Sequence, residues 1–195
     1  MVTKANSRHL SAIDAVALLG ICLVLLGAFY YQLVKGELPC AFCNLIRVGF
    51  MLLGSGLLLN IRFGTNAWNY VLSAFGALIG SLISLLFMFA KAPAWTTPTG
   101  SAVFGLHMYT WTYILFTAAI MFCVVMLAFA CRNPASVPPQ AGGGYATLRS
   151  IVTVAFIFLV GANLVSAFLQ NGFQTFKAGG QKHYQMLYDG DVMKP

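Results

Sequence analysis

Long apolar runs separated by short polar stretches are the dominant pattern in this sequence. Five such runs occupy about residues 13–34, 44–61, 68–90, 108–130 and 151–169. Each run approaches the roughly 20 apolar residues that a helix needs to cross a hydrocarbon core of about 30 Å. The pattern therefore predicts an all-α integral membrane protein, a helical bundle of about five transmembrane helices. We expect residues 1–169 to form this bundle and residues 170–195 to form an extracytoplasmic C-terminal tail.

Composition supports this class and narrows the choice of partners. Hydrophobic residues make up 59% of the chain and charged residues 8%, whereas a soluble domain carries about a quarter charged residues. The formal net charge of +7 would suggest nucleic acid or an anionic surface in a soluble protein. Here the lysines and arginines are scattered near the ends of the apolar runs. We expect them to face lipid headgroups, with the lipid bilayer as a partner and no nucleic acid.

The distribution of basic residues predicts the orientation in the membrane. Cytoplasmic loops carry an excess of Lys and Arg, and charges near the early spans weigh most. With a cytoplasmic N-terminus, the inner side holds five basic residues: Lys4, Arg8, Arg62, Arg132 and Arg149. The connection between the first two runs then lies on the extracytoplasmic face, which in a bacterium is the oxidising periplasm.

That connection contains a Cys-x-x-Cys pair, Cys40 and Cys43. Such a pair can close into a disulfide within one turn, so it can hold or release two electrons. Cys43 is expected near the N-terminus of the second helix, where unpaired backbone N–H groups and the helix dipole favour a thiolate. The pair is therefore the candidate catalytic centre of the chain.

Arg47 follows Cys43 by four residues, which places it on the same helix face one turn deeper. A permanent cation at the membrane edge is costly unless it has a partner or a function. It can stabilise a thiolate, or bind a carbonyl oxygen that becomes negative on reduction. Both roles suit electron transfer from a dithiol to a lipid-soluble quinone. The alternative is an interfacial arginine that extends its charge to the headgroups without a role in the chemistry.

The cysteine pair also admits interpretations without redox chemistry. It could be half of a zinc site or a structural staple. Zinc usually takes four ligands, and His107 and His183 show no ligand spacing relative to the pair. We therefore expect no metal.

Four further ionisable or thiol groups lie in or beside the apolar runs. Cys22 and Cys123 fall within predicted spans and Cys131 lies at the inner end of the fourth, so all three are expected to be buried structural cysteines. Asp14, at the inner end of the first run, is interpreted as a helix-start residue rather than a proton relay.

Small residues in the third run predict close helix packing. Gly76 and Gly80 are spaced like a small-xxx-small motif, which lets helix backbones approach one another. We expect this contact within the chain, with a homodimer contact as the alternative.

Several features together resemble the disulfide bond formation protein B (DsbB) family. They are the sequence Tyr30-Tyr31-Gln32 at the end of the first span, Pro39-Cys40-Ala41-Phe42-Cys43, Arg47, and a second span closed by a short inner turn. The resemblance implies a quinone reductase of the bacterial inner membrane that reoxidises a periplasmic thioredoxin-like thiol oxidase, like DsbA. It also implies that Cys43 lies next to the quinone, that Arg47 is the quinone-side cation, and that Cys40 exchanges disulfides with the partner.

The chain departs from the best-known members of that family in two ways. Those members carry a second cysteine pair in the outer loop between the third and fourth spans, whereas residues 91–107 contain no cysteine. They have four spans, whereas this chain has a four-helix core plus one and a tail. Either the partner thiolate attacks the Cys40–Cys43 disulfide directly, or another protein supplies the missing relay.

His107 and Trp111 open the fourth run at the outer edge of the membrane, close to the predicted depth of the cysteine motif. A quinone ring could stack on the aromatic side chains there and accept a hydrogen bond or a proton from His107. Both residues are therefore candidate cofactor-binding residues, beside Arg47. The alternative is an interfacial histidine among ordinary aromatic belt residues.

The sequence thus predicts a membrane thiol:quinone oxidoreductase that uses ubiquinone or menaquinone. Two alternatives stay open. One is a thiol relay like vitamin K epoxide reductase, which is also a helical bundle with Cys-x-x-Cys. The other is a non-enzymatic membrane subunit or assembly factor that contains a structural disulfide.

Overall fold

The computed structural model describes residues 2–91, 102–132, 144–172, 184 and 186. Its elements, in chain order, are α1 (Val2–Leu33), α2 (Ala41–Phe63), α3 (Ala67–Lys91), β1 (Ala102–Val103), β2 (Leu106–His107), α4 (Met108–Arg132) and α5 (Gly144–Asn171). Five helices in these ranges are long and apolar enough to cross a membrane, which confirms the predicted helical bundle. The predicted tail boundary at residue 170 stays a prediction, because residues 173–183, 185 and 187–195 lie outside the described part.

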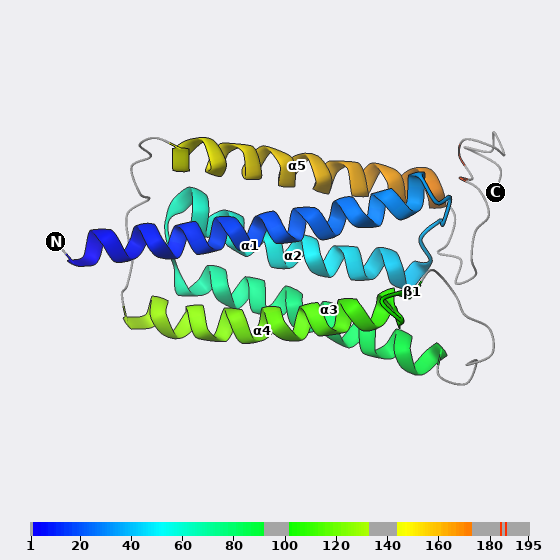
Figure 1. Cartoon of the computed structure of the whole chain (residues 1–195), viewed down its shortest axis with the longest axis horizontal. Coiled ribbons are helices and arrows are strands. Elements are labelled where there is room, and N and C mark those ends of the chain that lie inside the picture. Colours follow the sequence, from blue (N-terminus) through cyan, green and yellow to red (C-terminus); the bar gives the residue numbers. More distant parts are fainter. Residues whose placement is uncertain (1, 92–101, 133–143, 173–183, 185, 187–195) are drawn as a thin grey trace.

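The five helices lie side by side with their long axes roughly aligned (Figure 1). Helix α2 packs against α1, α3 and α5, while α1 also packs against α5 and α3 against α4. The N-terminal end of α1 lies at one end of the bundle. The α1–α2 connection, which contains the cysteine pair, lies at the other end together with the β1–β2 hairpin (Figure 1).

Two local features go beyond what the apolar runs predict. Helix α1 begins at Val2, so the polar segment before the first apolar run is helical; residues 2–19 contain no Gly or Pro that would break a helix. The predicted loop before the fourth span contains a short antiparallel hairpin in which Val103 pairs with Leu106. Phe104 (φ 51°) and Gly105 (φ 78°) make its two-residue turn, the conformation that suits a tight hairpin.

Asp14 is part of a buried polar cluster near the N-terminal end of the bundle, and is not a helix-start residue. The Tyr70 hydroxyl contacts both Asp14 carboxylate oxygens, at 2.9 and 2.8 Å. Asn60 accepts hydrogen bonds through Oδ1 from the Asn66 backbone N–H and the Asn69 side chain. Asp14, Tyr70 and Asn60 are fully buried, so these bonds join α1, α2 and α3 where water cannot replace them.

Glycines allow the helices to approach closely within the chain. A Cβ at Gly76 would lie 2.6 Å from the Leu53 backbone nitrogen on α2, and a Cβ at Gly80 would lie 2.3 Å from the Phe116 ring on α4. Gly49 of α2 faces Gly80 at a similarly short distance. The predicted small-residue packing within the chain is therefore observed, and it connects α3 to both of its neighbours.

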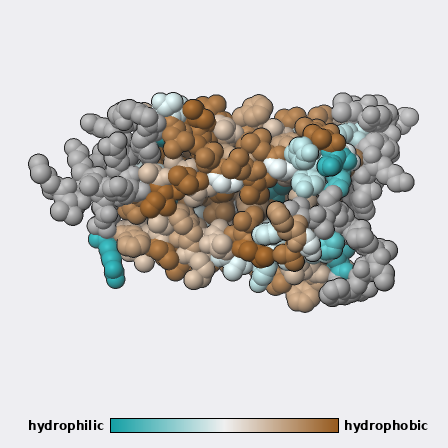
Figure 2. All heavy atoms as spheres, in the orientation of Figure 1, coloured by the Kyte–Doolittle hydropathy of each residue, from teal (hydrophilic) through white to brown (hydrophobic). Residues whose placement is uncertain are grey.

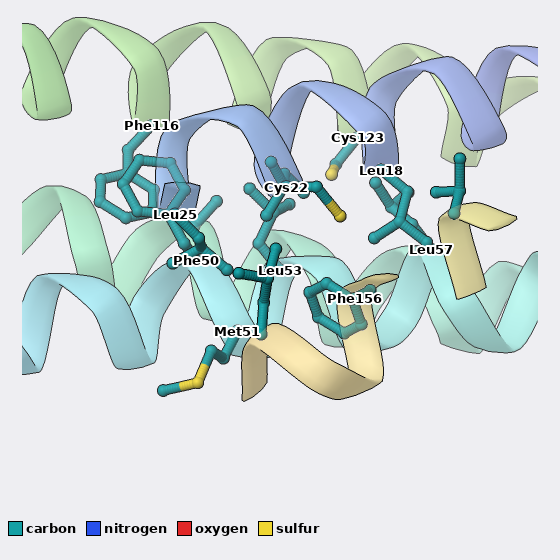
Figure 3. Packing of buried hydrophobic residues seen from close by; sticks show 14 of the residues in the cluster. Leu18, Cys22, Leu25, Phe50, Met51, Leu53, Leu57, Phe116, Cys123 and Phe156 are labelled. Atoms are coloured by element: carbon teal, nitrogen blue, oxygen red, sulfur yellow. The ribbon is translucent and has the colours of Figure 1, made fainter. Parts of the chain in front are cut away.

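Cys22 and Cys123 project from α1 and α4 into the buried hydrophobic cluster (Figure 3). Their burial agrees with the predicted structural role. Cys131 is different, because it is exposed at the last turn of α4, so the expectation that it is buried was wrong.

The surface matches a protein in contact with lipid. Hydrophobic residues cover most of the middle of the visible face, and hydrophilic residues gather toward its ends (Figure 2). Many large apolar side chains are exposed on all five helices, which is expected where lipid tails replace water.

We predict that Gly80→Ala destabilises the bundle. The added methyl group would meet the Phe116 ring, which cannot move easily because it is fully buried and stacks on Phe50 at a centroid distance of 4.1 Å. Overpacking of this kind costs about 1–3 kcal/mol, so the thermal unfolding midpoint in detergent should fall. Gly20→Ala is the matched control, since a Cβ there meets nothing within 4 Å. Equal midpoints for the two variants would contradict this account of the packing.

Candidate active site

The cysteine pair lies at the first turn of α2, but the cysteine that caps the helix is not the one that the sequence suggested. Cys40 is the N-cap of the helix, with extended backbone, and its Sγ accepts a hydrogen bond from the Cys43 backbone N–H at 3.3 Å. Cys43 lies within the first turn. The unpaired N–H groups at the start of the helix therefore stabilise the sulfur of Cys40. The sequence had suggested the sulfur of Cys43.

The two sulfurs lie 2.9 Å apart as free thiols. The hydrogen bond from the Cys43 thiol lowers the pKa of Cys40 to about 6, and backbone N–H groups act in the same direction. Partial burial opposes this shift but does not cancel it. Cys40 is consequently the thiolate of the reduced pair at neutral pH, and a thiolate is the form that attacks and exchanges disulfides.

Arg47 lies one helical turn below Cys43 and is buried, with 8% of its surface exposed. Its Nη1 donates to Gln32 Oε1 at 2.7 Å and to Asn163 Oδ1 at 3.4 Å, and its Nη2 donates to the Ala28 carbonyl at 3.2 Å. The guanidinium carbon also lies 5.4 Å from the centroid of the Phe29 ring. These contacts from α1 and α5 hold the guanidinium in one position.

The three hydrogen-bond acceptors of Arg47 named above are all neutral oxygens. Among the described residues, none of these hydrogen bonds goes to a carboxylate. Glu37 lines the same cavity, and Asp14 belongs to the polar cluster near the other end of α1. Hydrogen bonds satisfy the guanidinium without neutralising it. The site therefore keeps a full positive charge in a largely apolar setting, where its attraction for a negative group is strong.

Gln32 and Gln170 connect this site to the end of α5. Gln32 donates through Nε2 to Ser166 Oγ at 2.7 Å and to the Tyr184 hydroxyl, which leaves its Oε1 for Arg47. Gln170 donates through Nε2 to the Pro39 carbonyl at 2.6 Å. The side chains that orient Arg47 and the cysteine loop thus come partly from the last helix.

A cavity of about 880 Å³ adjoins the cysteine pair and Arg47. Its mostly apolar lining comes from α1 on one side, from α4 on the other, and from α2 and α3 between them. Gly27 exposes bare backbone on the α1 side, and a Cβ added there would meet nothing within 4 Å. The volume and the few converging polar groups are typical of a site for an apolar small molecule.

Aromatic side chains form much of the cavity edge near α4. The Phe42 ring stacks on Phe87 at 5.2 Å, and Phe87 meets Tyr109 edge to face at 5.2 Å. Trp111 lines the cavity, and its place beside a bound quinone ring stays a prediction. His107 stacks on Tyr109 with 5.2 Å between the ring centroids. Tyr109 lines the cavity and His107 does not.

The structure thus brings together Cys40, Cys43, Arg47 and Trp111, and adds residues that sequence reasoning did not identify. Asn163, Ser166 and Gln170 are separated by three and four residues, so they form one polar stripe on an otherwise apolar helix. That spacing is a signal in the sequence. It shows that one face of the fifth span meets polar groups, although it does not show which ones.

Comparison with known proteins supports the predicted resemblance. The family model "Disulfide bond formation protein DsbB" matches residues 11–101, which include α1 from Ser11 onward, α2 with its cysteine pair and Arg47, and α3. Helices α4 and α5 lie outside the match. Comparisons with curated proteins and with solved structures gave no match. The cysteine pair and Arg47 thus lie within the part of the chain that is similar to this family.

We predict that the alkylation rate of Cys40 rises through a midpoint near pH 6, as its thiol converts to the thiolate. An ordinary cysteine has its midpoint near about pH 8.5. In Cys43→Ala the hydrogen bond with the largest effect is lost, so the midpoint should move to higher pH. The measurement is the rate of iodoacetamide labelling of the Cys40 peptide, followed by mass spectrometry from pH 5 to 9.

Cys131→Ala is the control for this experiment, because Cys131 is exposed and lies at the far end of α4. Its Cys40 midpoint should equal that of the unmodified chain. Glu37, Lys91 and Arg47 line the same cavity and are present in both variants. A midpoint that stays near pH 6 in Cys43→Ala would show that the contact between the sulfurs is not the cause.

Proposed function

Because residues 11–101 match the DsbB family model, we propose that this chain is a membrane thiol:quinone oxidoreductase. It would reoxidise a periplasmic thioredoxin-like thiol oxidase, similar to DsbA, and pass the electrons to ubiquinone or menaquinone. The observation that carries the proposal is one arrangement. A dithiol with a reactive sulfur shares a mostly apolar cavity between α1 and α4 with a cation whose hydrogen-bond acceptors, in the described part of the chain, are neutral oxygens.

The first half of the reaction is disulfide exchange at Cys40. A partner thiolate attacks the Cys40 sulfur of the Cys40–Cys43 disulfide, and Cys43 leaves. The second partner thiol then displaces Cys40, so the partner departs as a disulfide while Cys40 and Cys43 become a dithiol. Two electrons and two protons have moved to the pair. The position of Cys40 at the N-cap, before the membrane-spanning part of α2, supports its role as the exchanging cysteine.

The second half returns the pair to its disulfide. A quinone would accept two electrons and two protons and become the quinol. The chain contributes the apolar walls that exclude water, the ring of Trp111 for stacking, and Arg47 beside the pair. Since the hydrogen-bond acceptors of Arg47 named above are neutral oxygens, its charge is available to stabilise negative charge on a thiolate or on a reduced oxygen.

The proposed location is the bacterial inner membrane, with the N-terminus in the cytoplasm and the cysteine pair in the periplasm. The bundle supports this in one respect: the cysteine pair and the N-terminus lie at opposite ends (Figure 1). The loop that would carry a second cysteine pair contains none. We therefore propose that the partner thiolate attacks the Cys40–Cys43 disulfide directly.

The test is turnover by the purified protein in detergent. We expect a reduced thioredoxin-like partner to be oxidised as a soluble analogue of ubiquinone or menaquinone is reduced, in a ratio of one to one. Cys43→Ala should abolish turnover. Arg47→Met should lower kcat/KM for the quinone by about tenfold or more, because removal of one positioned electrostatic donor typically costs 10²–10³ in rate. Turnover that survives Cys43→Ala, or a quinone epoxide as the preferred acceptor, would defeat the proposal.

We predict that Gly27→Phe raises the KM for the quinone analogue. The new ring would enter the cavity without displacing any packed atom, because no atom lies within 4 Å of the added Cβ. Gly20→Phe is the control, since Gly20 lies two turns earlier on the same helix face, has equally open surroundings, and does not line the cavity. We expect a KM increase of about fivefold or more in Gly27→Phe alone. The same KM in both variants would show that the quinone binds elsewhere.

A further inference from the structure

The polar stripe of α5 approaches the redox site at two places. Gln170 and Asn163 are each buried, with 4% of their surface exposed, and Ser166 lies between them on the same helix face. A helix that only anchored the chain in lipid would have no need of polar groups at these positions, because burying them is costly unless they form hydrogen bonds.

Gln170 holds the cysteine motif from both sides. Its Nε2 donates to the carbonyl of Pro39, the residue immediately before Cys40, at 2.6 Å. Its Oε1 accepts from the side chain of Asn44, the residue immediately after Cys43, at 3.4 Å. One side chain of α5 therefore fixes the loop that enters the motif and also contacts the first turn of α2. The short contacts of Cys40 Sγ with the Cys43 sulfur and N–H require that turn to stay in place.

Asn163 and Ser166 act on the cation. Asn163 Oδ1 accepts directly from Arg47, and its Nδ2 donates to the Leu159 carbonyl, which fixes the direction of the amide. Ser166 accepts from Gln32, whose other amide atom binds Arg47. Asn163 therefore presents an oxygen acceptor to the guanidinium directly, and Ser166 contacts it only through Gln32. Neither residue adds a negative charge that would neutralise Arg47.

We propose that α5 is a positioning element of the redox site, in which Gln170 fixes the Cys-x-x-Cys turn and Asn163 fixes the Arg47 guanidinium. The helix lies outside the residues that match the family model. The part that concerns Arg47 rests on the proposed quinone reduction. The part that concerns Gln170 is tested on the thiols alone, so the two can fail separately.

Gln170→Met tests the contact with the motif, because methionine keeps the length of the side chain and removes both hydrogen bonds. We expect alkylation of Cys40 at pH 7 to slow by about fivefold or more, since a released turn gives a smaller thiolate fraction. The KM for the quinone analogue should stay within about twofold, because Arg47 keeps its own ligands.

Asn163→Leu tests the contact with the cation and should give the opposite result. The KM for the quinone analogue should rise by about threefold or more as the guanidinium gains freedom, while alkylation of Cys40 stays unchanged. This pair of results distinguishes positioning from general destabilisation, which would move both measurements in both variants.

Thr153→Val is the matched control on the same helix. Thr153 is also buried and polar, but its hydroxyl has no hydrogen-bond partner in the described structure, so its loss should change neither measurement. If Gln170→Met fails to fold, Gln170→Glu replaces it. That variant keeps the acceptor for Asn44 and lacks the donor for Pro39, so Cys40 alkylation should again fall.

Unchanged Cys40 alkylation in a folded Gln170 variant, or an unchanged quinone KM in Asn163→Leu, overturns the inference while leaving the proposed function intact. A parent protein that reduces no quinone overturns the proposed function instead. In that case the alkylation rates still decide whether Gln170 positions the motif.

Discussion

A permanent charge that lies inside the membrane, and that donates only to neutral oxygens among the residues described, is the constraint on which this structure depends. Taking a guanidinium out of water is costly, and the usual solution is an opposite charge. Here, within the described part of the chain, Arg47 donates hydrogen bonds to neutral oxygens of Gln32, Asn163 and the Ala28 carbonyl. Its guanidinium also lies over the Phe29 ring. The hydrogen bonds offset the cost of burial, and the charge remains for a ligand or a thiolate. A carboxylate in this place would stabilise the arginine and remove its use in catalysis.

This constraint explains why the redox site has two unlike sides. On one side of α2, mostly apolar and aromatic side chains of α1, α3 and α4 surround the cavity, with Glu37 and Lys91 also in its lining. On the other side, α5 supplies amides and a hydroxyl to Arg47, Gln32 and the loop before Cys40. The first side is suited to bind an apolar molecule. The second holds the reacting groups still, as precise chemistry requires.

The sequence predicted the spans, because apolar length is a local signal, and the redox chemistry that it predicts for the motif rests on local spacing as well. Apolar length defines each helix, and the spacing of Cys40, Cys43 and Arg47 places them on adjoining turns. Three features could not be read from it. Residue spacing alone did not show that Cys40, and not Cys43, caps the helix. A polar residue inside an apolar run, such as Asn163, indicates a polar neighbour but not which one. Asp14 resembled a helix start only because the polar segment before it was expected to lie outside the helix.

The two ends of the bundle differ in how firmly they are closed. Near the end that holds the N-terminus, Asp14, Tyr70 and Asn60 join α1, α2 and α3 through hydrogen bonds that no water reaches. The large cavity lies at the opposite end. Opening of the cavity end to admit a ligand would therefore leave the hydrogen-bonded half of the bundle closed. In a membrane protein, this separation would let a ligand exchange at one face without opening a path for protons to the other.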